Sequence, residues 1–338
     1  MMISNQKGAK LTKTKSFSKF ISLIKQNRSF LITGHINPEG DSLGSSLALA
    51  LGLKKMGKKD VCVLSKDPVP EILKFLPSSK IVRQKPPGKE FDVVFMVDCN
   101  DIERTGYEGF RAKKTAIIDH HVLPANAEKS EFYKSVSASY IDTGAAAAGV
   151  LIYKLLTALK IPVDKNMATN LYTAILVDTG GFRYSNASAE SLRIASHLVA
   201  AGARPWDISK EVYESMPFRS MKLLGLSLAT LERKEGIAWI TTTNGMFKKT
   251  GATAEDSEDF VDFPRKVKDI EVAVFFRQNG AKSYKLSFRS KGRVNVQKIA
   301  KSFGGGGHFA AAGCKINGSL KEVQNKVFSA VRKAIKET

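Results

Sequence analysis

Short, continuously apolar runs that alternate with helical patterns constrain the fold of this chain more than any other feature. The runs lie at residues 30–34, 60–64, 93–97, 115–118 and around Tyr140. Strands that are apolar at every position are buried on both faces, as in a parallel sheet covered by helices. We therefore predict an α/β domain built on a parallel sheet, with helices after Asp41, after Thr143 and over residues 164–177.

The strand pattern stops after Ala203, and a helical stretch follows it. β-patterned runs resume at residues 236–243, 271–277 and 284–289, with helical patterns at 296–302 and from Ser319. The length allows two domains, since a single core rarely exceeds about 250–300 residues. The predicted organisation is a basic N-terminal tail at 1–15, an α/β domain at 16–204, a helical connector at 205–225 and a smaller α+β domain at 226–338.

The composition is that of a globular protein with polyanionic partners. The chain has 53 Lys and Arg residues and 32 Asp and Glu residues, a net charge of +21, and such an excess favours nucleotide or RNA partners. No run approaches the roughly 18 consecutive apolar residues of a membrane span. The three cysteines are widely spaced, which suggests neither a disulfide framework nor a thiolate zinc site. We expect a cytoplasmic protein with no membrane partner, and we interpret the Lys-rich N-terminus as a tail and not as an organellar presequence.

Carboxylates and imidazoles gather where the apolar runs end. They are His35, Glu39 and Asp41 after the first run, Asp98 after Val97, Asp119, His120 and His121 after Ile118, and Asp178 at the end of a helical run. A single Asp after a strand is usually a turn former or a helix cap, but here the acidic loops also contain most of the histidines. Because ligands of α/β sheets bind beyond the carboxyl ends of the strands, we predict that these side chains share one site.

The donor types indicate a metal site. Mixed His and Asp/Glu donors without Cys suit a hard divalent ion such as Mn²⁺ or Mg²⁺ better than structural zinc. At least six donors are present, which suggests two ions. Two ions about 3.5–4 Å apart stabilise the attacking and leaving oxygens of a phosphoryl displacement and generate hydroxide at neutral pH.

Four motifs resemble, in order, those of the DHH phosphoesterase superfamily. They are HINPEGDSLGS at residues 35–45, VDCND at 97–101, IDHHV at 118–122 and VDTGGFRYSN at 177–186. A fifth stretch, GGGGHFAAAG at 304–313, resembles the glycine-histidine motif of the C-terminal domain of RecJ-like exonucleases and of the shorter NrnA-type enzymes. The length and the short connector are most similar to the two-domain NrnA type. This resemblance implies an active site in the cleft between the two domains.

The resemblance also implies a role for each matching residue. It assigns one ion to His35 and Glu39, the other to Asp41, His120 and Asp178, a bridging position to Asp98, and catalytic roles to Asp98, His120 and His121. His121 would face the scissile phosphate, and Asp119 would orient an imidazole. The implied cofactor is a pair of Mn²⁺ ions, with Mg²⁺ or Co²⁺ as alternatives. The family usually has Asp where this chain has Glu39, so this side chain is one methylene longer.

In the C-terminal domain, the resemblance implies a substrate-binding set. Its members are Arg289, Ser290, Gly305, Gly306, Gly307 and His308. Glycine lets backbone amides approach a phosphate closely, and a guanidinium binds phosphate through two parallel hydrogen bonds. From the residues alone, a flexible turn is the less favoured alternative for the glycine run, and a surface-strand position is the alternative for Arg289.

The resemblance implies a phosphodiesterase that hydrolyses short RNA oligonucleotides to nucleoside 5′-monophosphates and removes the 3′-phosphate of 3′-phosphoadenosine 5′-phosphate (pAp). Some relatives instead cleave cyclic di-AMP or linear dinucleotides. The glycine-histidine stretch argues against a class II pyrophosphatase, and the length argues against an exonuclease for longer DNA. A non-catalytic nucleotide- or nucleic-acid-binding protein is the alternative of another class, suggested by the net charge of +21 and by Glu39. Relatives are often homodimers, and the sequence does not decide this point.

Overall fold

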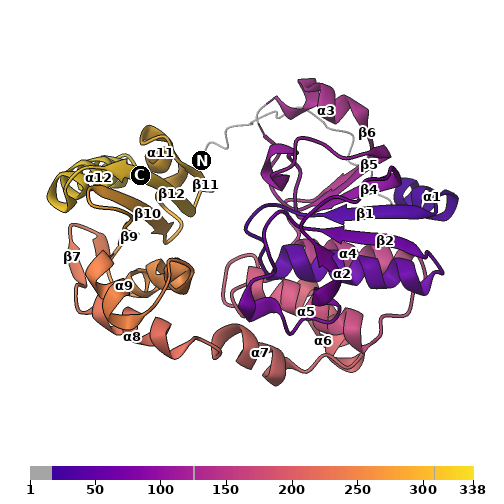
Figure 1. The fold of residues 1–338 in the computed structure, drawn as a ribbon, viewed down its shortest axis with the longest axis horizontal. Coiled ribbons are helices and arrows are strands. Elements are labelled where there is room, and N and C mark those ends of the chain that lie inside the picture. The colour runs from indigo at the N-terminus through magenta and orange to yellow at the C-terminus, as the bar shows by residue number, and fades with distance from the viewer. Residues whose placement is uncertain (1–16, 125, 308) are drawn as a thin grey trace, which may run out of the picture. The chain divides into compact units, whose positions relative to one another are not determined.

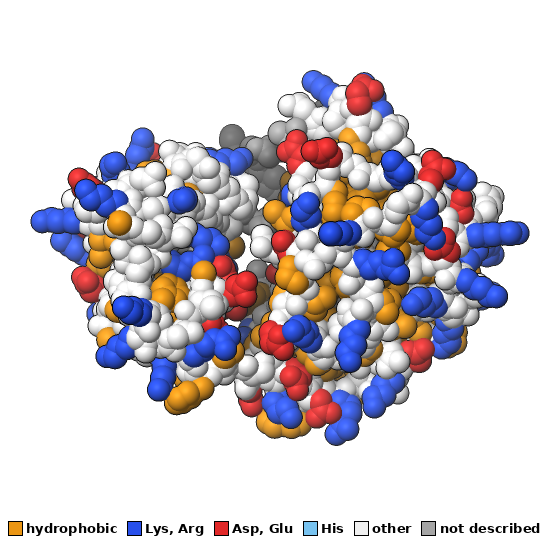
Figure 2. Space-filling model, viewed as in Figure 1, with side chains coloured by type: hydrophobic (Ala, Val, Ile, Leu, Met, Phe, Trp, Pro, Cys, Tyr) orange, Lys and Arg blue, Asp and Glu red, His pale blue; other side chains and the backbone are white. Residues whose placement is uncertain are grey.

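The computed structural model describes residues 17–124, 126–307 and 309–338. The chain divides into two compact units between Ser215 and Met216. Lys and Arg side chains are spread over both units on the face drawn in Figure 2, in keeping with the net charge of +21. Within the described ranges, no helix is both long enough and apolar enough to cross a membrane. The basic tail predicted at residues 1–15 lies outside the described residues.

The first unit is built on a parallel sheet of six strands (Figure 1), which confirms the predicted α/β domain. The strands are β1 (Ser29–Thr33), β2 (Asp60–Leu64), β3 (Val82–Arg83), β4 (Phe91–Val97), β5 (Ala112–Asp119) and β6 (Val136–Ile141). Their order is β3-β2-β1-β4-β5-β6, and all neighbours are parallel. The chain passes from β1 through β2 to β3 at one edge of the sheet. It then returns to β4 beside β1 and continues through β5 to β6 at the other edge. The carboxyl ends of β1 and β4 therefore flank the crevice in which sheets of this order bind ligands.

Helices cover this sheet and are joined by short 3-10 turns. The helices are α1 (Ser18–Gln26), α2 (Gly40–Lys55), α3 (Glu131–Ser135), α4 (Ala148–Ala158), α5 (Lys165–Asp178), α6 (Ala189–Ala200) and α7 (Pro205–Tyr213), and the turns are Glu71–Leu73, Ser79–Ile81, Glu103–Thr105 and Ala127–Lys129. Phe30, Ile32 and Phe95 pack in one core with Leu47 of α2 and Leu151 of α4. The alternate strand residues form smaller clusters that include side chains from the loops. The runs in β1 and β4 are thus buried on both faces, as their composition predicted, whereas β2 and β6 are only partly buried.

One predicted helix start is wrong. The sequence places a helix directly after Thr143, but α4 begins at Ala148. The Asp142 carboxylate accepts a hydrogen bond from the N–H of Gly144 at 3.1 Å, which forms a local turn. The first free N–H groups of α4 instead donate to Asp41, a residue from a distant part of the chain.

The second unit has a mixed sheet of six strands in the order β11-β12-β10-β9-β8-β7, in which only β8 and β9 are parallel among the described pairs. Its strands are β7 (Glu232–Lys234), β8 (Ile237–Thr242), β9 (Val272–Gln278), β10 (Ser283–Ser290), β11 (Gly306–Gly307) and β12 (Ala311–Asn317). Its helices are α8 (Phe218–Leu228), α9 (Asn244–Thr250), α10 (Asp262–Arg265), α11 (Val296–Ser302) and α12 (Leu320–Lys336), with a 3-10 helix at Glu255–Val261. Separate apolar cores lie on the two faces of the sheet. The predicted α+β composition is confirmed, while β7, β11 and β12 were not predicted.

Candidate metal centre

The carboxyl ends of β1, β4 and β5 bring the predicted ligands together with the start of α2 and the end of α5. His35 lies two residues after β1, Asp98 directly follows β4, and His120 directly follows β5. Glu39 and Asp41 flank the first residue of α2, and Asp178 is the last residue of α5. The structure therefore places all six residues predicted to bind metal together, beyond the carboxyl ends of β1, β4 and β5.

Asp98 is the centre of the site. It is fully buried and has a left-handed backbone conformation with φ of 58°, which Asp tolerates better than most residues. One carboxylate oxygen, Oδ2, lies 3.4 Å from Nε2 of His35, and the other, Oδ1, lies 3.4 Å from Nε2 of His120. Neither oxygen has a hydrogen-bond partner among the described residues. A buried carboxylate in this state needs a cation.

Two groups of three ligands share this neighbourhood. One contains His35, Glu39 and Asp98, and the other contains Asp41, His120 and Asp178. Nε2 of His120 lies 3.5 Å from Oδ2 of Asp41 and 3.7 Å from Oδ2 of Asp178, and Nε2 of His35 lies 3.7 Å from Oε1 of Glu39. Two donors bound to one ion at about 2.0–2.3 Å are roughly 3–3.5 Å apart. These gaps are long for hydrogen bonds and suit donors that share a cation.

The imidazoles of His35 and His120 are both held with Nε2 toward the Asp98 carboxylate. Nδ1 of His35 lies 2.7 Å from the carbonyl oxygen of Ile36, and Nδ1 of His120 lies 3.2 Å from that of Ala145. A carbonyl can only accept, so Nδ1 carries the proton and Nε2 is the nitrogen available to a metal ion. Nε2 of both residues is buried and lacks a hydrogen-bond partner in the described part of the chain.

The electrostatics of the site reflect its excess of negative charge. Burial lowers the pKa of His35 and of His120, but attraction by Asp98 outweighs it and raises each pKa to about 10. Burial opposes ionisation of Asp98, yet the two imidazoles hold its pKa well below the usual range. Burial and the charge of Asp98 raise the pKa of Asp41, and they raise that of Asp178 to about 6. Protons on the imidazoles thus balance part of the negative charge of the carboxylates.

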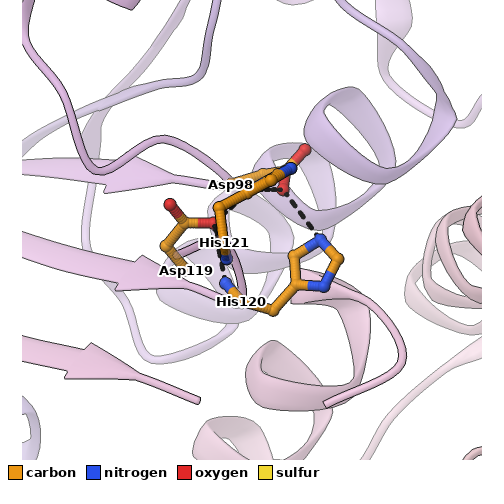
Figure 3. Close-up of side chains that lie close together, drawn as sticks. All are labelled: Asp98, Asp119, His120 and His121. Atoms are coloured by element: carbon orange, nitrogen blue, oxygen red, sulfur yellow. Dashed lines mark hydrogen bonds and ion pairs between the residues drawn. The ribbon is translucent and has the colours of Figure 1, made fainter. Parts of the chain in front are cut away.

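The predicted catalytic residue His121 is held by Asp119 (Figure 3). Nδ1 of His121 donates to Oδ1 of Asp119 at 2.8 Å, and the same oxygen accepts from the backbone N–H of His120 and of His121 at 2.7 and 3.1 Å. Asp119 is fully buried, so its carboxylate fixes the loop that carries both imidazoles. Nδ1 of His121 also lies 3.4 Å from Oδ1 of Asp98, which places His121 beside the predicted metal ligands.

The residues predicted to bind substrate lie in the second unit. Arg289 is near the end of β10, with Nε 3.6 Å from Oδ1 of Asp262, and the Ser290 hydroxyl accepts from the N–H of Gly292. Gly305, Gly306 and Gly307 lie beside β12, and the last two form β11. A Cβ on Gly305 would be 2.2 Å from the carbonyl oxygen of Gly313, so close packing against β12 requires glycine there. His308 lies outside the described residues, and substrate binding by this set stays a prediction.

Sequence reasoning missed two residues that contact the ligands. The Ser45 hydroxyl donates to Oδ1 of Asp41 at 2.9 Å, a contact that the spacing of four residues on a helix could have indicated. Asn186 donates to the backbone carbonyl of Asp178 at 3.0 Å. It is the last residue of the fourth motif, but neither its residue type nor its spacing from Asp178 indicated this contact.

Comparison with known proteins agrees with this architecture. The DHH family N-terminal domain matches residues 29–175, and the DHHA1 domain matches residues 238–337. The bifunctional oligoribonuclease and PAP phosphatase NrnA of Thermus thermophilus is 32% identical over 90% of this chain and 89% of its own length. The NrnA of Bacillus subtilis is 25% identical over 88% of this chain and 93% of its own. An exopolyphosphatase-related protein from Bacteroides fragilis superposes with a TM-score of 0.84 at 26% identity and covers 93% of this chain and 94% of its own.

Proposed function

Because the chain belongs to the DHH family of phosphoesterases, we propose that it uses two Mn²⁺ ions to hydrolyse short RNA oligonucleotides to nucleoside 5′-monophosphates, and pAp to AMP and phosphate. One observation carries the proposal. The buried Asp98 carboxylate lies between two groups of ligands, with no hydrogen-bond partner for either oxygen among the described residues. Its position suits a bridge between two ions. The NrnA relatives, which span nearly the same length, support the choice of substrates.

The donor set supports Mn²⁺ as the ion. Imidazole and carboxylate donors together, with no thiolate in either group of ligands, suit Mn²⁺ better than Zn²⁺ or Ca²⁺. His35 and Glu39 would hold one ion, Asp41, His120 and Asp178 the other, and Asp98 would touch both. Bound ions of this kind supply hydroxide at neutral pH and neutralise charge on the phosphoryl oxygens.

The chain's own residues orient the reaction. Asp98 and the imidazoles of His35 and His120 are held in position before substrate arrives, which reduces the reorganisation needed in the transition state. Asp119 accepts a hydrogen bond from Nδ1 of His121 and so fixes the orientation of this imidazole beside Asp98. Water adds to phosphorus, the bond from phosphorus to O3′ breaks, and the released 3′-oxygen takes up a proton. With pAp the same bond breaks, and the products are AMP and inorganic phosphate.

A substrate comparison tests the proposal. The metal-free protein, reconstituted with Mn²⁺, is assayed on a 5′-labelled RNA series from dinucleotide to 24-mer, with pAp, cyclic di-AMP and pyrophosphate alongside and with an EDTA-treated sample as the control. We expect fast release of mononucleotides from the shortest RNAs and of phosphate from pAp, both lost with EDTA. Binding of two ions without turnover of any substrate would contradict the proposal and favour a non-catalytic binding protein.

A cyclic-dinucleotide activity is the second candidate. The cyclic-di-AMP phosphodiesterase PdeA of Listeria monocytogenes is 23% identical over 91% of this chain, although the chain spans only 48% of that protein. Cleavage confined to cyclic di-AMP in the same assay would favour this function over the hydrolysis of short RNA.

A further inference from the structure

Residues 145–149, which we call the turn, include the last residues before α4 and the first two residues of α4. The backbone of this turn contacts the predicted ligands of one ion. The N–H groups of Ala148 and Gly149 donate to Asp41 at 2.6 and 2.9 Å. The carbonyl of Ala145 lies 3.2 Å from Nδ1 of His120. These residues are Ala and Gly, so none of the contacts is made by a polar side chain of the turn itself.

Asp41 shows what these bonds achieve. An ionised carboxylate offers about four lone-pair positions. Oδ1 accepts from Gly149 and from the Ser45 hydroxyl, and Oδ2 accepts from Ala148. The position that is left belongs to Oδ2, the oxygen that lies 3.5 Å from Nε2 of His120. These hydrogen bonds therefore leave Asp41 one lone pair for a metal ion, on the carboxylate oxygen that is near His120.

Asn186 joins the third ligand to the same turn. Its side-chain Nδ2 lies 3.0 Å from the carbonyl oxygen of Ala146, 3.0 Å from that of Asp178, and 3.4 Å from Oδ2 of Asp178. The amide thus connects the end of α5 to the start of α4. With this contact, the turn is linked to all three members of the group Asp41, His120 and Asp178.

The other group is held differently. His35 is fixed by the carbonyl of its own neighbour Ile36, at 2.7 Å. Glu39 is half exposed, directly before the first residue of α2. A change in the turn should therefore affect one group of ligands and spare the other.

We propose that the turn at residues 145–149 and Asn186 form a positioning device that fixes the geometry of one metal site, the one formed by Asp41, His120 and Asp178. Asn186 is a positioning residue, since it acts through Asp178 and the turn. This inference rests on the proposed metal-dependent function and adds the residues that order one of its two sites. Loss of such outer contacts typically costs 10- to 100-fold in metal affinity.

Calorimetric titration of the metal-free protein with Mn²⁺ tests the proposal without any substrate. Asn186→Ala should weaken one of the two binding events about tenfold or more and leave the other within about twofold. The matched control is Arg183→Ala, which removes a side-chain bond to the carbonyl of Gly180 in the same loop, 2.6 Å long, and leaves the turn untouched. Thermal unfolding of the metal-free variants should change little in either case, because both side chains lie in the same exposed loop.

A second pair of variants tests the backbone of the turn. A Cβ on Gly149 would lie 2.7 Å from Cβ of Ala174 and 3.5 Å from Oδ1 of Asp41, so Gly149→Ala should displace the start of α4 and weaken the same binding event. Gly144→Ala is the control, because its Cβ would meet only Oδ1 of Asp142, at 3.4 Å. Parent-like binding of two ions by both Asn186→Ala and Gly149→Ala would overturn the inference alone. A parent protein that bound no Mn²⁺ would overturn the proposed function as well.

Discussion

Asp98 in the first unit and Arg277 in the second are buried charges with opposite surroundings. In the first unit, Asp98 is fully buried and its oxygens have no hydrogen-bond partner among the described residues. In the second unit, the buried Arg277 donates through Nη1 to the carbonyl of Ala254 at 2.6 Å and to Oε1 of Glu258 at 2.9 Å. Burying a charge is costly unless it is paired and hydrogen-bonded. The charge of Arg277 thus supports the fold, whereas we propose that the charge of Asp98 serves a bound cation.

Among the variants that test the different roles of Asp98 and Arg277, Asp98→Asn should have the largest effect. Because the amide cannot bridge two cations as a carboxylate does, hydrolysis should fall roughly a thousandfold or more, and the rise in melting temperature caused by Mn²⁺ should disappear. The control is Asp101→Asn in the same loop, whose carboxylate accepts only from the N–H of Glu103 among its described contacts. Near-parental turnover by Asp98→Asn would remove the basis for the bridging role.

Arg277→Met should lower the stability of the protein and leave metal binding unchanged, the reverse of what we expect for Asp98→Asn. Loss of the guanidinium leaves the carbonyl of Ala254 and the Glu258 carboxylate without their buried donor, so the free energy of unfolding should fall by about 2 kcal/mol. Mn²⁺ stoichiometry should stay unchanged. Urea unfolding measures the first quantity and calorimetry the second.

Lys285→Met is the matched control for that variant. Lys285 contacts the same Glu258 carboxylate from an exposed position, at 3.2 Å, so its loss should cost less than about 0.5 kcal/mol. A cost as large as that of Arg277→Met would show that the burial of Arg277 is not what distinguishes the two contacts.

The stability of the metal-free protein should depend on pH because of the two imidazoles in the site of the first unit. His35 and His120 have pKa values of about 10 in the folded protein, above the ordinary value of about 6.5. A raised imidazole pKa contributes stability that is fully present below pH 6.5 and is lost as the pH rises toward 10. Metal-free protein should therefore melt at a lower temperature at pH 9 than at pH 6.5.

Mn²⁺ should release about one proton per imidazole that becomes a ligand, so its affinity should rise roughly tenfold per pH unit for each site between pH 6 and 8. Calorimetry in buffers of different ionisation enthalpy counts the released protons. Binding without proton release would mean that the two imidazoles are not protonated in the metal-free site.

Much of this site could be predicted from the sequence because its chemistry coincides with the ends of strands. A continuously apolar run that stops at a carboxylate identifies both a buried strand and its carboxyl end, as at Asp98 and Asp119. The contacts made by the backbone could not be predicted in this way. The start of α4 was misplaced because its N–H groups are bound by Asp41, 107 residues earlier in the chain. The strand β12 was missed because its small residues Ala311, Ala312 and Gly313 give a weak alternating pattern.

Among substitutions of the predicted metal ligands, Glu39→Gln should have the smallest effect, because Glu39 is the most exposed of them. The Glu39 side chain is 52% exposed, whereas Asp41 is fully buried and fixed by three hydrogen bonds. An exposed, mobile ligand contributes less to affinity than one held in place, since ordering its side chain costs conformational entropy. We expect Mn²⁺ affinity at the His35 group to fall about threefold to tenfold, against a larger loss at the other group in Asp41→Asn. Equal losses in the two variants, measured by Mn²⁺ calorimetry, would show that prior positioning does not set the strength of these sites.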